Sequence, residues 1–195
     1  MSTPASRIRR ALGRPVVTAA VAAAVSSAVA VLLFAVITTA AFAWALTASL
    51  AAAAAAMAVV DARTHRLPNR YVAALAAAGL VQAIAAAVAS HDPIRLLDLL
   101  VAAAAVGAAY VLLGLVGWFG FGDTKFAGAL TLTVAIYAGL AAMYIVPLAI
   151  LFAALWTLLS RALGRDARPR AHGPAIALAA ISVMTASVLI APPGG

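Results

Sequence analysis

The sequence predicts an all-α membrane protein, a bundle of about seven transmembrane helices, with six as the alternative count. Of the 195 residues, 67% are hydrophobic and only 9% are charged, whereas soluble domains carry about 25% charged residues. A surface so poor in charge would not stay dispersed in water, and the high hydrophobicity excludes an intrinsically disordered chain. Because one span takes about 20 residues, the chain has no room for a sizeable soluble domain.

The apolar segments follow one another with short breaks between them. Residues 15–60 contain no charged side chain, which is too long a stretch for one span and long enough for two. Thr38 and Thr39 mark the expected turn between these two spans, and charged or turn-forming residues separate the later ones. The expected spans, in chain order, are residues 16–37, 40–60, 71–89, 96–117, 126–142, 144–160 and 174–191.

The spans divide the chain into four expected parts. These are a basic N-terminus at 1–15, an extra N-terminal span at 16–39, a membrane-embedded domain at 40–191 and a C-terminal tail at 192–195. A basic stretch before an apolar run is also typical of a signal peptide, and Ala41-Phe42-Ala43 could serve as its cleavage site. The apolar run is about 22 residues, longer than the usual 7–15 of a signal peptide, which favours a retained span.

The basic residues set the expected orientation, because Lys and Arg concentrate in the cytoplasmic loops of membrane proteins. With the N-terminus in the cytoplasm, 12 of the 13 basic residues lie inside and only Arg95 lies outside. We therefore expect an integral protein of a prokaryotic inner (cytoplasmic) membrane. The basic residues form short clusters between apolar blocks, which argues against nucleic acid as a partner and favours contact with membrane lipid.

Metal and thiol chemistry find little support in the sequence. The chain contains no Cys, which excludes disulfides, a cysteine-ligated zinc site and a thiol nucleophile. The three histidines, His65, His91 and His172, are scattered and form no helical pair. We therefore assign no metal site and no cofactor.

Two of the five acidic residues stand apart from the others. Asp92 and Asp98 fall near an expected outer loop, and Asp166 lies among arginines of an inner loop. Asp61 instead ends the long uncharged stretch, and Asp123 begins a later span. Because an acid that faces lipid is costly, we expect these two to face the bundle or a water-filled cavity at the same membrane face.

Two facing carboxylates suit one particular reaction. They do not both ionise easily, so they share a proton, and one can activate water while the other polarises a scissile carbonyl. That is aspartic protease chemistry. Gly120 and Gly122, which flank Phe121 just before Asp123, would leave room for a substrate backbone. A second interpretation is that each acid is an interfacial anchor, or a partner of Arg63 or Lys125.

Around these residues the sequence resembles the type IV prepilin peptidases. The first motif, D-x-R-x-x-x-[IL]-P-N, is present as Asp61, Arg63, Leu67, Pro68 and Asn69. The second motif, G-x-G-D-x-K-x-x-x-A, is present as Gly120, Gly122, Asp123, Lys125 and Ala129. A late Gly173-Pro174 at the start of the last span adds to the resemblance, which covers roughly residues 55–180.

The resemblance implies an intramembrane aspartic endopeptidase with Asp61 and Asp123 as its catalytic pair. Its substrate would be a prepilin or pseudopilin, whose basic leader it removes at the cytoplasmic face beside an apolar N-terminal helix. Lys125 and the motif glycines would support the site. Many members also carry an N-terminal domain with Cys pairs that methylates the product. This chain has no Cys and so resembles the short, peptidase-only form.

Two alternatives stay open at this point. Another G-x-G-D intramembrane protease would normally pair its motif with Tyr-Asp, whereas here Val60 precedes Asp61. A non-enzymatic membrane subunit for transport or secretion would use the two acids to bind an ion or arginines. The sequence identifies neither the pilin served nor the oligomeric state.

Overall fold

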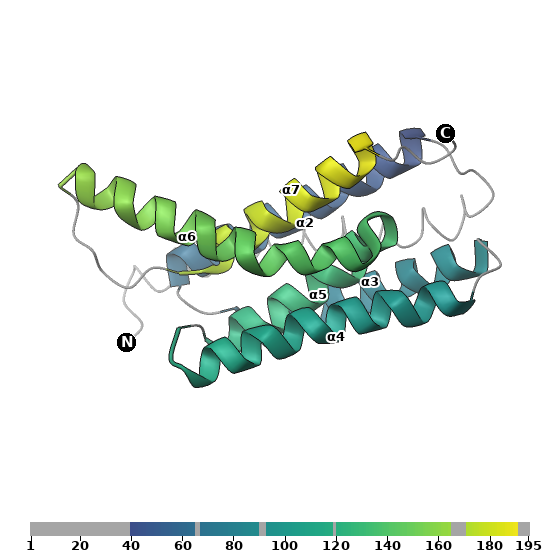
Figure 1. Ribbon diagram of the computed structural model, residues 1–195, viewed down its shortest axis with the longest axis horizontal. Coiled ribbons are helices and arrows are strands. Elements are labelled where there is room, and N and C mark those ends of the chain that lie inside the picture. The colour runs from purple at the N-terminus through teal and green to yellow at the C-terminus, as the bar shows by residue number, and fades with distance from the viewer. Residues whose placement is uncertain (1–39, 65–66, 90–92, 119, 165–170, 191–195) are drawn as a thin grey trace, which may run out of the picture.

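A computed structural model describes residues 40–64, 67–89, 93–118, 120–164 and 171–190 (Figure 1). These residues form helices, and no strand occurs among them, which confirms the all-α fold class. The helices are α2 (Ala40–Thr64), α3 (Asn69–Ala89), α4 (Pro93–Leu115), α5 (Phe121–Ala138), the 3-10 helix η1 (Gly139–Tyr144), α6 (Ile145–Ala162) and α7 (Gly173–Ile190).

Five stretches of the described chain are long and apolar enough to cross a membrane. Four of them correspond to α2, α3, α4 and α7, and the fifth is Phe121–Ala162, a stretch of 42 residues that contains α5, η1 and α6. At 1.5 Å per residue, such a stretch is about 63 Å long, roughly twice the apolar thickness of a bilayer. The expected count of about seven spans is therefore only roughly matched, and the expected span 16–37 lies outside the described residues.

The chain reverses its direction between α5 and α6. Gly139 has a φ of 53°, in the left-handed region that glycine adopts without a steric penalty. Its N–H donates to the Ala135 carbonyl at the end of α5. The turn continues through η1, and α6 runs back along the bundle (Figure 1). These two antiparallel helices correspond to the expected spans 126–142 and 144–160, and the break between them lies at Gly139–Tyr144 instead of at residue 143.

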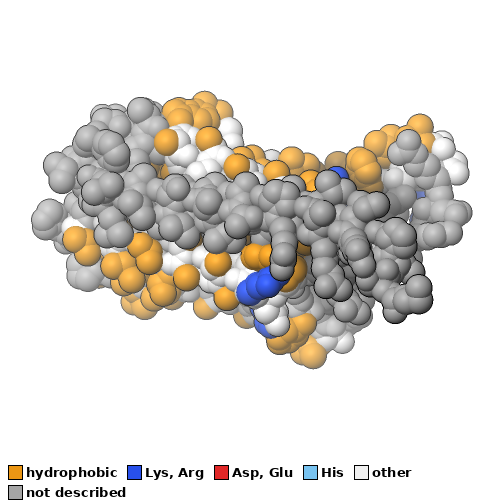
Figure 2. Space-filling view, turned by 180° about the vertical axis from the view of Figure 1, so that it is seen from behind, with side chains coloured by type: hydrophobic (Ala, Val, Ile, Leu, Met, Phe, Trp, Pro, Cys, Tyr) orange, Lys and Arg blue, Asp and Glu red, His pale blue; other side chains and the backbone are white. Residues whose placement is uncertain are grey.

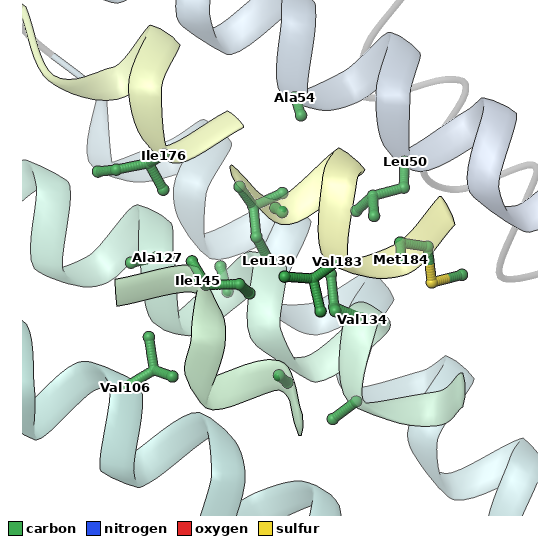
Figure 3. Close-up of a cluster of buried hydrophobic side chains, with 14 of the residues drawn as sticks. Leu50, Ala54, Val106, Ala127, Leu130, Val134, Ile145, Ile176, Val183 and Met184 are labelled. Atoms are coloured by element: carbon green, nitrogen blue, oxygen red, sulfur yellow. The ribbon is translucent and has the colours of Figure 1, made fainter. Parts of the chain in front are cut away.

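Helix α5 lies at the centre of the described bundle, packed against α3, α4 and α7, while α2 packs along α7. Small residues allow this close approach: a Cβ atom on Gly79 of α3 would lie 2.9 Å from Leu132 Cβ of α5. The core is an apolar cluster contributed by most of the helices (Figure 3). Its labelled members are Leu50, Ala54, Val106, Ala127, Leu130, Val134, Ile145, Ile176, Val183 and Met184.

The outer surface of the bundle is apolar. Helix α6 exposes a row of large hydrophobic side chains, namely Leu151, Leu155, Trp156, Leu158 and Leu159. Figure 2 shows one face on which the described surface is largely hydrophobic and basic side chains occupy only small areas. Such a surface is stable in contact with lipid and would aggregate in water. The chain is thus an integral membrane protein.

Candidate active site

Asp61 lies near the C-terminal end of α2 and is almost fully buried, with 5% of its surface exposed. Its Oδ2 accepts a hydrogen bond of 2.8 Å from the backbone N–H of Gly173, the first residue of α7. An acid at the C-terminal end of its own helix is electrostatically unfavourable. The N-terminus of α7 places the opposite partial charge beside the Asp61 carboxylate.

The close approach of α7 to Asp61 requires a glycine at position 173. A Cβ atom there would lie 2.6 Å from Asp61 Oδ2 and 3.0 Å from Asp61 Cβ, closer than real side chains come. The exposed Pro174 lies in the first turn of α7, where its missing N–H costs no intrahelical hydrogen bond. Gly173 therefore allows α7 to contact Asp61, and Pro174 is compatible with the first turn of that helix.

Asp123 lies in the first turn of α5 and has 9% of its surface exposed. Its Oδ2 accepts a hydrogen bond of 3.0 Å from the Gly120 N–H, and the Asp123 N–H donates to the Gly120 carbonyl at 3.0 Å. The Asp123 side chain thus caps the N-terminus of α5 by accepting the backbone N–H of Gly120, as the third helical residue does in a capping box. Like Asp61, it is held by a backbone N–H at the start of a helix.

The structure brings the two carboxylates from α2 and α5 to the same end of the bundle. Both are buried, and they lie close enough for the charge of Asp61 to act on Asp123. Neither acid forms an ion pair with Arg63 or Lys125 among the described contacts; Arg63 is exposed at the end of α2. The interpretation of the acids as simple partners of these basic residues is therefore not supported.

Lys125 joins the two sequence motifs. Its Nζ donates to Asn69 Oδ1 at 3.2 Å and lies 5.2 Å from the centre of the Phe121 ring. The Pro68 carbonyl accepts the N–H groups of Tyr71 and Val72, so Pro68 starts α3 and presents Asn69 to α5. The residues of the first motif thereby position the start of α5, where Asp123 lies.

The fold requires a glycine at position 173 but not at the two motif positions, Gly120 and Gly122. A Cβ atom on Gly120 would lie 3.4 Å from Asp123 Oδ2, and one on Gly122 would lie 3.5 Å from Leu67 Cβ, both ordinary contacts. Gly120 has an extended backbone that any residue adopts, with φ −83° and ψ 157°. Packing within the chain therefore does not explain these two glycines, and space for a bound peptide remains our prediction.

Two residues near the site were missed by the sequence analysis. His172 is half-buried, lies directly before Gly173 and is within electrostatic reach of Asp123. Tyr110 of α4 is fully buried and interacts electrostatically with Asp123. The position of His172 beside the Gly-Pro pair was an available signal, whereas Tyr110 lies in an apolar span without one. No three His, Cys, Asp or Glu side chains of the described chain gather to hold a metal ion.

The sequence matches the model of a known protein family. The model of the type IV leader peptidase family matches residues 48–159 of this chain, which is more than half of its 195 residues. The matched range contains Asp61, Asp123 and both motifs, and it ends before Gly173. No curated protein and no solved structure matches the chain.

Proposed function

Because the chain belongs to the type IV leader peptidase family, we propose that it is an aspartic endopeptidase of the membrane. Its substrate is a type IV prepilin or pseudopilin, whose basic leader it removes at the cytoplasmic face. One observation carries the proposal: two buried carboxylates from separate helices lie at one end of the bundle, within electrostatic reach of each other. Membership of the family makes the chain a peptidase, while the substrate and the membrane face belong to the proposal.

The hydrogen bonds of the two acids support acid–base hydrolysis. In both carboxylates Oδ2 accepts the backbone N–H, and in the proposed reaction the Oδ1 atoms face a water molecule. With one proton shared between the acids, the ionised carboxylate takes a proton from water as the water attacks the scissile carbonyl. The protonated carboxyl donates to the carbonyl oxygen, giving a gem-diol. Its collapse breaks the C–N bond, and a proton passes to the leaving amine.

The surroundings of the acids suit a substrate that enters from the membrane. The apolar helix of a prepilin would lie in lipid beside the bundle, and its scissile bond would reach the depth of Asp61 and Asp123. The exposed Gly120 and Phe121 offer a surface for the extended peptide beside Asp123. Exposed basic side chains near this end, Arg63 and Lys125, would contact anionic lipid headgroups.

Reconstituted protein and a synthetic prepilin test this function. The purified chain is placed in lipid vesicles with a peptide that has a basic leader, a glycine and an apolar helix, and the products are identified by mass spectrometry. We expect a single cut between the leader and the apolar helix. A cut inside the apolar helix would instead indicate a G-x-G-D protease of another specificity, and an intact peptide would contradict the proposed activity.

A further inference from the structure

A single glutamine lies inside the apolar part of the bundle. Gln82 is the one glutamine of the chain, and it lies in the second half of α3 with 3% of its surface exposed. Its Oε1 accepts the 2.8 Å hydrogen bond from the Thr133 hydroxyl of α5. None of the described residues accepts a hydrogen bond from its Nε2. Because a buried amide donor without a partner is costly, we expect this nitrogen to have a partner outside the chain.

A small cavity adjoins the Gln82 amide group. Residues of three helices line it, namely Ser49, Leu50 and Ala53 of α2, Leu75, Ala78 and Gln82 of α3, and Thr133 of α5. The space that is open to the centre of a water-sized sphere is about 10 Å³, and roughly 10–15 Å³ of such space holds one water molecule. Three of the lining side chains are polar, and a buried water molecule makes about three hydrogen bonds. The cavity therefore has the size and the polar groups that one water molecule requires.

The three polar side chains offer the donors and acceptors that a water molecule needs. The Ser49 hydroxyl donates to the Leu46 carbonyl of its own helix at 2.8 Å, and the Thr133 hydroxyl donates to Gln82. Both hydroxyl oxygens keep lone pairs that accept hydrogen bonds. The Nε2 atom of Gln82 carries two protons to donate. A water molecule can thus accept one hydrogen bond from the amide and donate one to each hydroxyl.

The cavity lies on the side of α2 that faces α3. Helix α2 packs mainly along α7 and has little direct contact with α3, although the two helices are consecutive in the chain. Ser49 lies 12 residues before Asp61, and Thr133 lies ten residues after Asp123. These separations correspond to about 18 Å and about 15 Å along the helices. The cavity is therefore at a similar depth with respect to both acids, and it is too far from them to supply the water that attacks a substrate.

We propose that this cavity binds one water molecule, which bridges α2 to α3 and α5. The water accepts a hydrogen bond from Gln82 Nε2 and donates hydrogen bonds to Ser49 Oγ and Thr133 Oγ1. Hydrogen bonds through such a water are nearly as favourable as direct ones. The water thereby connects the helix that carries Asp61 to the helix that carries Asp123. This inference is independent of the proposed function, because it concerns the packing of the helices and not the reaction.

Solid-state NMR of the whole, isotopically labelled protein in lipid vesicles detects this water directly. Magnetisation passes from water protons to nearby N–H groups, and the side-chain amides of Gln82 and Asn69 are distinguishable because the chain has one glutamine and one asparagine. Asn69 is exposed at the start of α3 and reports contact with bulk water. The backbone N–H of Leu130, a fully buried residue of α5, reports a site without water. We expect the Gln82 signal to rise with that of Asn69 and well before that of Leu130.

Variants that fill the cavity locate the water. Ser49→Val and Ala53→Val each add methyl groups to the lining, so the early Gln82 signal should be lost in both. Ser187→Val in α7 is the matched control, because the Ser187 hydroxyl also donates to a carbonyl of its own helix, at 2.9 Å, and does not line the cavity. Its Gln82 signal should stay early. Thermal unfolding in detergent identifies the folded variants, and the cavity is filled if either of the two is folded.

Two results would overturn the proposal. A wild-type Gln82 signal that rises as slowly as that of Leu130 would show that the cavity holds no water. An early Gln82 signal that persists in a folded filling variant would show that water reaches this amide by a route outside the cavity. Cleavage of a prepilin is not needed for either result, so the test does not depend on the proposed function.

Discussion

Gly173 lies against Asp61 so closely that no side chain fits between them. The Gly173 N–H donates to Asp61 Oδ2 at 2.8 Å, and a Cβ atom on Gly173 would lie 2.6 Å from the same oxygen. The two residues are 112 positions apart in the chain. The last helix therefore holds a carboxylate of the second helix in place, and a late Gly-Pro pair becomes part of the site.

We predict that Gly173→Ala abolishes most of the activity. The added methyl group must push α7 or the Asp61 side chain away, and a displacement of about 1 Å at a reacting group costs about 100-fold in rate. The expected cost in stability from this overpacking is about 1–3 kcal/mol. Cleavage of a prepilin and thermal unfolding in detergent measure the two effects.

Gly107→Ala in α4 is the matched control, because a Cβ atom at that position would meet no other side chain and no other helix within 4 Å. Alanine favours the helix interior by about 1 kcal/mol over glycine, so this variant should be as stable as wild type or more so. Its activity should be unchanged. Equal activity of Gly173→Ala and Gly107→Ala would contradict the role that we give to the α7 contact.

The link between Lys125 and Asn69 is predicted to couple the two motifs. Lys125→Met and Asn69→Ala each remove one partner of the 3.2 Å hydrogen bond. Because both side chains are exposed, we expect a coupling energy of only about 0.5–1 kcal/mol in a double-mutant cycle. The cycle is measured by denaturation in detergent micelles. Strictly additive effects would show that the bond does not connect α3 to α5 in solution.

A buried polar pair between α3 and α5 offers a test of the packing away from the acids. The Thr133 hydroxyl donates to Gln82 Oε1 at 2.8 Å, and both residues are buried. Thr133→Val leaves the Gln82 amide oxygen without this donor, which should cost about 0.6 kcal/mol and at most about 1.7 kcal/mol, the average and the maximum for such bonds in membranes. The Thr133→Val variant should still cleave a prepilin at temperatures below its own, lowered melting temperature.

Thr157→Val is the matched control for that variant. The Thr157 hydroxyl donates to Ala153 O within its own helix, α6, so its loss breaks no contact between helices. We expect a change within about 0.5 kcal/mol. If Thr157→Val destabilised the protein as much as Thr133→Val, the Gln82 contact would not be the cause of the effect.

The fold class and the two acids could be predicted from the sequence for one reason, the scarcity of charge. In a chain with only five acidic residues, Asp61 and Asp123 are conspicuous at the ends of apolar segments. The ends of the helices were harder to predict, because an apolar run shows which residues lie in the membrane and a helix can extend beyond that run. Helix α5 begins at Phe121 and not at the expected residue 126, because the Asp123 carboxylate and Gly120 cap it before the apolar run starts.

Contacts between distant segments could not be predicted from composition or spacing. The bond from Gly173 to Asp61 depends on how α7 packs along α2, and no local pattern encodes that packing. The same holds for Arg95, expected in an outer loop, whose Nη2 donates to the Ile136 carbonyl at 2.8 Å near the end of α5. His172 and Tyr110 reach Asp123 only through this packing of the helices. Such residues emerge once the helices are assembled.

The most direct test of the central claim is prepilin cleavage by proteins in which single carboxylates are replaced by amides. Asp61→Asn and Asp123→Asn keep the shape and the hydrogen-bond acceptor of each side chain but remove its acid–base chemistry. Asp98→Asn is the control, since Asp98 is exposed on α4. We predict that either site variant loses cleavage by about 10⁴-fold or more, while remaining folded in the membrane, and that the control cleaves normally. Normal cleavage by Asp61→Asn or Asp123→Asn would contradict the account.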